Sequence, residues 1–140
     1  MYGNLGFERY GQLAKTATAA YHNLHWNAAL DTYGGDDGVV QTMIIPALAL
    51  QCAPSAEITA KAVAGLQHDL ETRTDYHLST GAVMTNWLLE VMSENGLHES
   101  ALRVATQTTY PSWGWWLALN ATTCWETWHI TVMHGLSIWY

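Results

Sequence analysis

Apolar residues recur every three or four positions along most of this 140-residue chain, and this spacing is the feature that most constrains its fold. Such a repeat places side chains on one face of an α-helix, whereas a half-buried β-strand alternates at every second residue. We therefore predict an all-α protein, made of helices joined by short turns, with no convincing strand. The clearest stripe is Tyr10, Leu13, Ala17, Ala20 or Tyr21, and Leu24.

Glycine, proline and aspartate residues mark where the predicted helices end. A proline, Pro46, lies inside the second helical segment, so a helix kinked there is favoured and two short helices are the alternative. The expected helices cover residues 6–24, 39–52, 54–70, 82–95, 98–108 and 131–139, with turns or loops at 27–38 and 73–81.

Charge is almost absent from the last quarter of the chain. Residues 104–140 contain one Asp, Glu, Lys or Arg, which is Glu126, together with six of the eight tryptophans. Because indole rings keep water away from a carboxylate, we expect the pKa of Glu126 to be raised, as in general acids and bases. The alternative is a structural glutamate that caps a backbone amide or pairs with Arg103.

The tryptophans themselves allow two interpretations. Indole faces stack on the C–H faces of sugar rings, so a tryptophan-lined pocket with few carboxylates suits a carbohydrate. For any single tryptophan, packing in a helical core is the more common role. Six of them in a segment poor in charge favour a pocket.

The overall composition excludes several classes of partner. The formal net charge is -7 and basic runs are missing, which argues against nucleic acid. No apolar stretch reaches the roughly 18 residues of a membrane span, and the first residues do not have the pattern of a secretory signal.

No metal and no cofactor are predicted. His22 and His25 have a spacing that can bind a metal, but a third ligand is not evident. Asp31, Asp36 and Asp37 lack the spacing of a calcium-binding loop, so a solvated turn is the favoured interpretation.

Three motifs resemble those of the bacterial α-L-rhamnosidases of glycoside hydrolase family 78. They are TTYPSWG at residues 108–114, ATTCWETW at 121–128 and HLSTG at 77–81. The segments LLEVMSENG and ALRVATQ, and the C-terminal stretch from His134 to Tyr140, are similar to the family in the same order.

This resemblance implies an (α/α)6 barrel of the six-hairpin glycosidase type. Residues 1–140 would be the C-terminal portion of its catalytic domain, truncated at the N-terminus. The implied partners are a rhamnose-containing glycoside or polysaccharide and the missing N-terminal half of the same polypeptide.

The resemblance also implies hydrolysis of terminal α-L-rhamnose with inversion. Inversion uses two carboxyl groups roughly 6.5–9.5 Å apart, with a water between one of them and the sugar. Glu126 matches the glutamate that activates this water, Trp125 and Trp128 would wall the sugar subsite, Trp113 would support it, and His134 would contact the sugar.

The second carboxyl group of that mechanism is not matched in this chain. In the family the general acid lies upstream, in an acidic stretch that the sequence lacks, so we expect the isolated chain to be inactive. The alternative is a non-catalytic sugar-binding protein or a degenerate remnant of the same fold.

Overall fold

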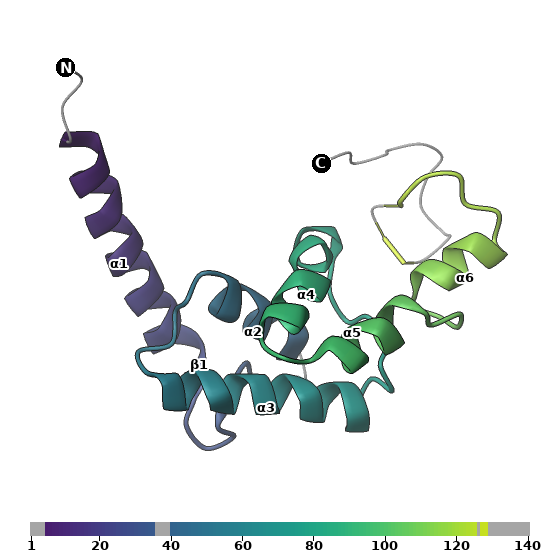
Figure 1. The fold of residues 1–140 in the computed structure, drawn as a ribbon, viewed down its shortest axis with the longest axis horizontal. Helices are drawn as coiled ribbons and strands as arrows, with labels where there is room; N and C mark the ends of the chain where they lie inside the picture. Colours follow the sequence, from purple (N-terminus) through teal and green to yellow (C-terminus); the bar gives the residue numbers. More distant parts are fainter. Residues whose placement is uncertain (1–4, 36–39, 126, 129–140) are drawn as a thin grey trace. The chain divides into compact units, whose positions relative to one another are not determined.

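The computed structural model describes residues 5–35, 40–125 and 127–128. These residues are mostly helical, as predicted, with one small hairpin in addition (Figure 1). The elements in chain order are α1 (Leu5–His25), β1 (Trp26–Asn27), β2 (Thr32–Tyr33), α2 (Val40–Ala49), α3 (Ala56–Thr72), α4 (Ala82–Glu94), α5 (His98–Ala105) and α6 (Trp113–Ala118).

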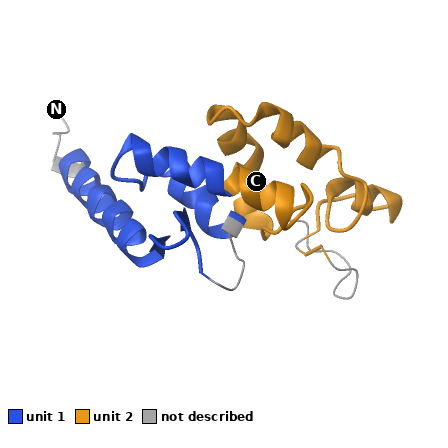
Figure 2. Cartoon of the chain, turned by 90° about the horizontal axis from the view of Figure 1, so that it is seen from below, with its two compact units in different colours: residues 1–65 blue, residues 66–140 orange. Residues whose placement is uncertain are grey.

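The chain divides into two compact units, residues 1–65 and residues 66–140, and the division falls inside α3 (Figure 2). Each unit contains fully buried apolar side chains, which exclude water and supply most of the stabilisation. In the first unit these include Tyr33, Ile44, Ile45 and Ala62, and in the second Leu70, Leu88, Met92 and Val104.

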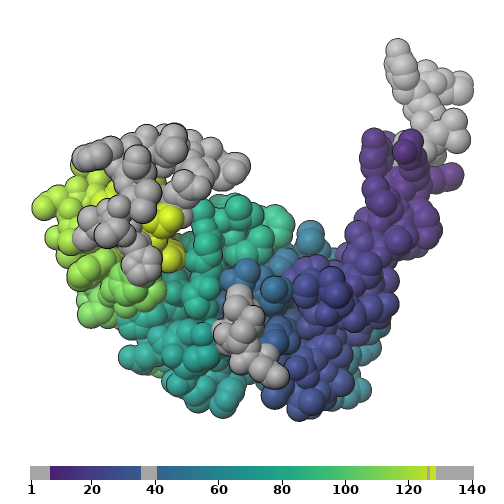
Figure 3. All heavy atoms as spheres, turned by 180° about the vertical axis from the view of Figure 1, so that it is seen from behind, coloured from purple at the N-terminus to yellow at the C-terminus, as the bar shows by residue number. Residues whose placement is uncertain are grey.

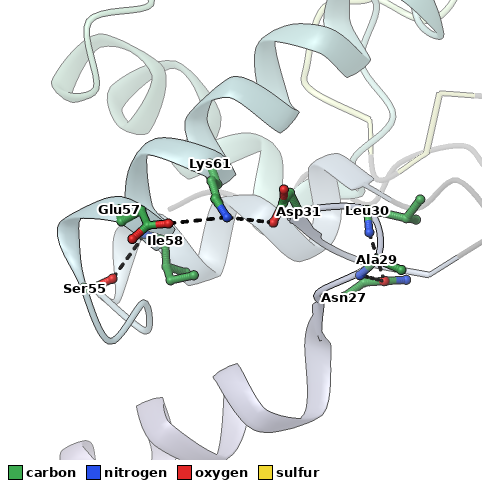
Figure 4. A network of polar contacts seen from close by, with 8 residues as sticks. All are labelled: Asn27, Ala29, Leu30, Asp31, Ser55, Glu57, Ile58 and Lys61. Atoms are coloured by element: carbon green, nitrogen blue, oxygen red, sulfur yellow. Dashed lines mark hydrogen bonds and ion pairs between the residues drawn. The ribbon is translucent and has the colours of Figure 1, made fainter.

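The first unit contains a hairpin where the sequence predicts only a turn. Its two short strands pair antiparallel, with Trp26 opposite Tyr33. The Asn27 side-chain oxygen accepts hydrogen bonds from the backbone N–H groups of Ala29 and Leu30, at 3.0 and 3.2 Å (Figure 4). This local turn, made by an asparagine side chain, reverses the chain and lets the two strands meet.

Lys61 of α3 joins the turn of the hairpin to the start of its own helix. Its Nζ lies 3.0 Å from Asp31 Oδ1 and 3.5 Å from Glu57 Oε1 (Figure 4). The hydrogen bond that Lys61 donates to Asp31, with a smaller contribution from Glu57, raises the pKa of Lys61. Asp31, considered above for calcium, is therefore engaged by a lysine.

Tyr33 is fully buried, and its hydroxyl lies 2.9 Å from His22 Nδ1. Burial is the main cause that raises the pKa of Tyr33 to about 12, with a smaller effect of Cys52. Tyr33 therefore keeps its proton at ordinary pH, and its hydroxyl donates to His22 Nδ1 in the neutral tautomer that carries the ring proton on Nε2. In the pair His22 and His25, considered above as metal ligands, His22 Nδ1 is therefore already engaged in a hydrogen bond within the fold.

The apolar stripe predicted for α1 is present but largely uncovered, and Leu24, near the C-terminal end of the helix, is 77% exposed. Phe7, Tyr10 and Leu13 have exposed fractions of 84%, 69% and 60%, and the N-terminal end of α1 stands clear of the rest of its unit in the space-filling view (Figure 3). Towards the other end of the helix, the Tyr21 hydroxyl donates to the Met43 carbonyl oxygen at 3.0 Å. An amphipathic helix normally buries its apolar face against other elements.

Several predicted helix bounds differ from the observed ones. α2 is one helix with Pro46 inside it, as favoured above, but it ends at Ala49 rather than at residue 52. α5 ends at Ala105, three residues early, because the chain turns there into the segment that precedes α6. The helix predicted at 131–139 lies outside the described residues.

Two helical glycines provide a matched test of the packing in the first unit. A Cβ added at Gly65 would lie 2.5 Å from Thr32 Oγ1, whereas one at Gly11 meets nothing within 4 Å. Both Gly→Ala changes gain helix propensity, up to about 1 kcal/mol. We expect Gly11→Ala to stabilise the chain and Gly65→Ala to destabilise it by about 1–3 kcal/mol through overpacking. Thermal unfolding followed by circular dichroism measures both, and equal shifts of the two variants would contradict the contact.

Candidate functional site

The three motifs singled out in the sequence lie in the second unit, and two of them are joined by side-chain and backbone hydrogen bonds. We call them the HLSTG loop (residues 77–81), the TTYPSWG segment (108–114) and the ATTCWETW segment (121–128). His77 Nε2 of the loop lies 2.7 Å from Thr109 Oγ1, and the Leu78 N–H donates to the Pro111 carbonyl oxygen at 3.4 Å. The loop and the segment, about 30 residues apart in sequence, are thus held side by side.

The contacts of His77 define which of its nitrogens carries the proton. Nδ1 lies 2.9 Å from the Thr74 carbonyl oxygen and 2.8 Å from that of Asp75. Carbonyl oxygens only accept hydrogen bonds, so Nδ1 is the protonated nitrogen. In the neutral ring Nε2 then accepts from the Thr109 hydroxyl, which fixes the orientation of the imidazole.

The start of α6 is set by the TTYPSWG segment. Ser112 is fully buried, and its Oγ accepts a hydrogen bond from the Trp115 N–H at 3.0 Å, which caps the helix. Gly114 has no room for a side chain, because an added Cβ would lie 2.4 Å from the Gln107 carbonyl oxygen. In this motif Ser112 therefore caps α6, and Gly114 lies where the backbone leaves no space for a larger residue.

Four indole rings from α6 and the ATTCWETW segment form a cluster, which we call the indole cluster: Trp113, Trp116, Trp125 and Trp128. Trp116 stacks on Trp128 with ring centroids 4.3 Å apart and an interplanar angle of 23°. Trp125 lies 5.8 Å from Trp116, and Trp113 meets Trp128 edge-on at 6.2 Å. Such offset and edge-on pairs are favourable beyond the area that they bury.

The HLSTG loop contacts this cluster directly. The Trp128 Nε1–H donates to the Thr80 carbonyl oxygen at 2.8 Å, across 48 residues of sequence. All three motifs therefore meet in one region of the second unit.

The structure brings together three of the five predicted site residues. Trp113, Trp125 and Trp128 all belong to the indole cluster. Glu126 and His134 lie outside the described residues. The alternative partner considered for Glu126, Arg103, has its guanidinium carbon 3.4 Å from the centroid of the Tyr76 ring.

Sequence reasoning missed Trp116 and Thr80 as parts of this site. Trp116 is 6% exposed and is the ring that touches both Trp125 and Trp128. Its position three residues after Trp113 on α6 was the available signal, since residues at that spacing share a helix face. Thr80 belongs to the HLSTG motif, but nothing in the sequence indicated its contact with Trp128, because that contact is made by a backbone carbonyl.

The Trp116 Nε1–H is a buried donor without a hydrogen-bond partner among the described residues. An unpaired buried donor costs about 1–3 kcal/mol. The centre of the indole cluster therefore contains a polar group that an additional acceptor would stabilise.

Two kinds of feature are absent from the described part of the chain. Within it, no group of three or more His, Cys, Asp or Glu residues could hold a metal ion. None of its helices has the length and hydrophobicity needed to cross a bilayer.

Comparison with known protein families shows that nearly the whole chain matches one of them. Residues 4–136 match the model of the bacterial alpha-L-rhamnosidase 6 hairpin glycosidase domain. The chain belongs to this family. The match confirms both the resemblance noted in the motifs and the six-hairpin type of fold.

Individual relatives of this rhamnosidase-family chain agree with the match. An alpha-L-rhamnosidase of Streptomyces avermitilis is 36% identical over 69% of the chain, and one of Alteromonas sp. (strain LOR) is 31% identical over 89%. The chain spans 10% and 14% of the lengths of these two proteins.

Two solved structures are similar to the rhamnosidase-family chain. The alpha-L-rhamnosidase from Dictyoglumus thermophilum has a TM-score of 0.78 and 30% identity over 88% of the chain, which corresponds to 14% of that protein. The Streptomyces avermitilis alpha-L-rhamnosidase complexed with L-rhamnose has a TM-score of 0.73 and 30% identity, covering 86% of the chain and 11% of that protein.

The cap of α6 gives a testable consequence for the site. Ser112→Ala would leave the Trp115 N–H without its acceptor in a buried setting, so we expect a loss of about 1–2 kcal/mol in unfolding free energy. Ser55 makes a similar but exposed bond to the Ile58 N–H at 3.3 Å, and we expect Ser55→Ala to cost less, about 0.5 kcal/mol. Urea denaturation followed by tryptophan fluorescence compares the two, and a larger loss at Ser55 would contradict the burial argument.

Proposed function

We propose that this chain supplies the water-activating carboxylate and part of the sugar subsite of an α-L-rhamnosidase catalytic domain. The reaction would be hydrolysis of terminal α-L-rhamnose with inversion at the anomeric carbon. The observation that carries this proposal is the gathering of Trp113, Trp125 and Trp128 around Trp116. The relative of known structure that was crystallised with L-rhamnose adds support for the ligand class.

In this proposal the indoles bind the apolar side of the sugar. Trp125 and Trp128 would form the wall of the subsite, and Trp113, packed edge-on against Trp128, would support it. Aromatic rings suit this task because they offer a large, rigid apolar face that stacks on C–H groups. His134 would add a polar contact to the sugar.

Glu126 would act as the general base. It stands between Trp125 and Trp128 in the sequence and is the lone Asp, Glu, Lys or Arg residue of positions 104–140. In an inverting hydrolase this carboxylate accepts a proton from the water that attacks the anomeric carbon. An environment of indoles would keep its basicity high by penalising the charged form.

The general acid would come from another part of a longer polypeptide, of which residues 1–140 would be the C-terminal part of the catalytic domain. The chain spans 10% and 14% of two rhamnosidases that it matches. The exposed Phe7, Tyr10 and Leu13 of α1 support this proposal, because an uncovered apolar helix face is the expected result when packing partners are missing. The remaining helices of an (α/α)6 barrel would cover it.

A second candidate function is sugar binding without catalysis, in a degenerate remnant of the same fold. The observation that supports it is the indole cluster, because indole faces can stack on a sugar without any chemical step. Both candidates use the indole cluster, so they differ in turnover rather than in binding.

Binding of L-rhamnose tests the feature that both candidates share. We expect saturable changes in the indole N–H signals of Trp125 and Trp128 when the ¹⁵N-labelled chain is titrated with L-rhamnose. L-Fucose, a 6-deoxy sugar of different stereochemistry, is the matched control and should bind at least about tenfold more weakly. Trp128→Ala should weaken binding of L-rhamnose by about tenfold, which corresponds to the loss of about 1.4 kcal/mol of contact free energy.

Two outcomes of this titration would contradict the proposal. If the signals of Trp26 change as much as those of the cluster, the sugar does not bind at the cluster. If Glu126→Gln leaves the affinity unchanged, the carboxylate does not belong to the subsite.

An assay of hydrolysis of an aryl α-L-rhamnoside tests whether the 140-residue chain lacks the general acid. We expect no turnover by the 140-residue chain. Turnover that disappears in Glu126→Gln would support the role of Glu126 and would show that the chain contains a second carboxyl group after all, with Glu94, Glu90 and Asp75 to be tested by substitution.

A further inference from the structure

Trp128 lies in a segment without helix or strand, so its side-chain contacts determine how its ring is oriented. Its Nε1–H donates to the Thr80 carbonyl oxygen at 2.8 Å, and one face of its ring stacks on Trp116. Fixing a large side chain costs conformational entropy, which such contacts must offset.

The carbonyl group that holds Trp128 is itself held by α4. Thr80 is 2% exposed, and its Oγ1 lies 2.6 Å from Thr85 Oγ1 in the first turns of that helix. The Thr85 hydroxyl donates to the Gly81 carbonyl oxygen at 2.9 Å. The Thr80 hydroxyl then donates to Thr85, because each hydroxyl has one proton to give. The two threonines therefore fasten the HLSTG loop to the start of α4.

From this chain of contacts we infer that Thr80 and Thr85 are positioning residues for Trp128. The threonine pair fixes the loop, the loop carbonyl fixes the indole N–H, and Trp116 covers one ring face. A ligand at the indole cluster can then meet Trp128 through the part of the ring that Trp116 and Trp113 leave uncovered, and not through its N–H. This inference rests on the proposed function for the identity of the ligand as L-rhamnose.

Substitution of Thr85 tests the inference, with a matched pair of variants. Thr85→Val has nearly the same shape but lacks the hydroxyl, whereas Thr85→Ser keeps it. The readout is the rate at which the Trp128 indole proton exchanges with solvent, measured by nuclear magnetic resonance with the signal assigned by Trp128→Phe. Trp26, in the other unit, is the internal control.

We expect exchange at Trp128 to be about two- to tenfold faster in Thr85→Val, in line with the net contribution of about one hydrogen bond. Affinity for L-rhamnose should fall by a similar factor. Thr85→Ser should match the unaltered chain in both measurements, and Trp26 should exchange at the same rate in all three proteins.

The inference is overturned if exchange at Trp128 is unchanged in Thr85→Val, or if the valine and serine variants behave alike. A parallel rise at Trp26 would also overturn it, since the effect would then be general destabilisation. If the expected exchange pattern appears but the unaltered chain does not bind L-rhamnose, the positioning of Trp128 is supported and the proposed sugar subsite alone is contradicted.

Discussion

The hydrogen bond between the Trp128 indole and the Thr80 carbonyl, together with the stacking of Trp116 on Trp128, is the interaction on which the candidate site depends. It joins the HLSTG loop to the ATTCWETW segment, and Trp113 of the TTYPSWG segment packs against the same indole. Without it the ATTCWETW segment, which has no regular secondary structure from residue 121 to 125, would have little to order it. The arrangement is an aromatic cluster anchored by polar contacts at its edge.

Helix positions could be predicted from the sequence, because apolar spacing and helix-breaking residues are local signals. α3 and α4 therefore begin close to the predicted residues. The hairpin around Asn27 and the early end of α5 were missed. The hairpin depends on hydrogen bonds of the Asn27 side chain. The end of α5 depends on the packing of the later segment around Gly114 against residues 107–108. The spacing of apolar residues carries no information on either.

The candidate site was predictable to the extent that its residues belong to recognisable motifs. Trp113, Trp125 and Trp128 were found in this way, and they lie together in the structure. The role of Thr80 was not predictable, since it acts through a backbone atom and across 48 residues. Pairings of this kind follow from the tertiary fold and not from residue type.

The central claim is that the indole cluster, with Glu126, is the place where the sugar binds. A crystal structure of the chain with L-rhamnose tests this claim most directly. The account predicts a sugar ring against the part of the Trp128 indole that Trp116 and Trp113 leave free, with the Glu126 carboxylate turned toward it. A sugar bound elsewhere, or a Glu126 carboxylate on the open surface and turned away from Trp125 and Trp128, would contradict the account.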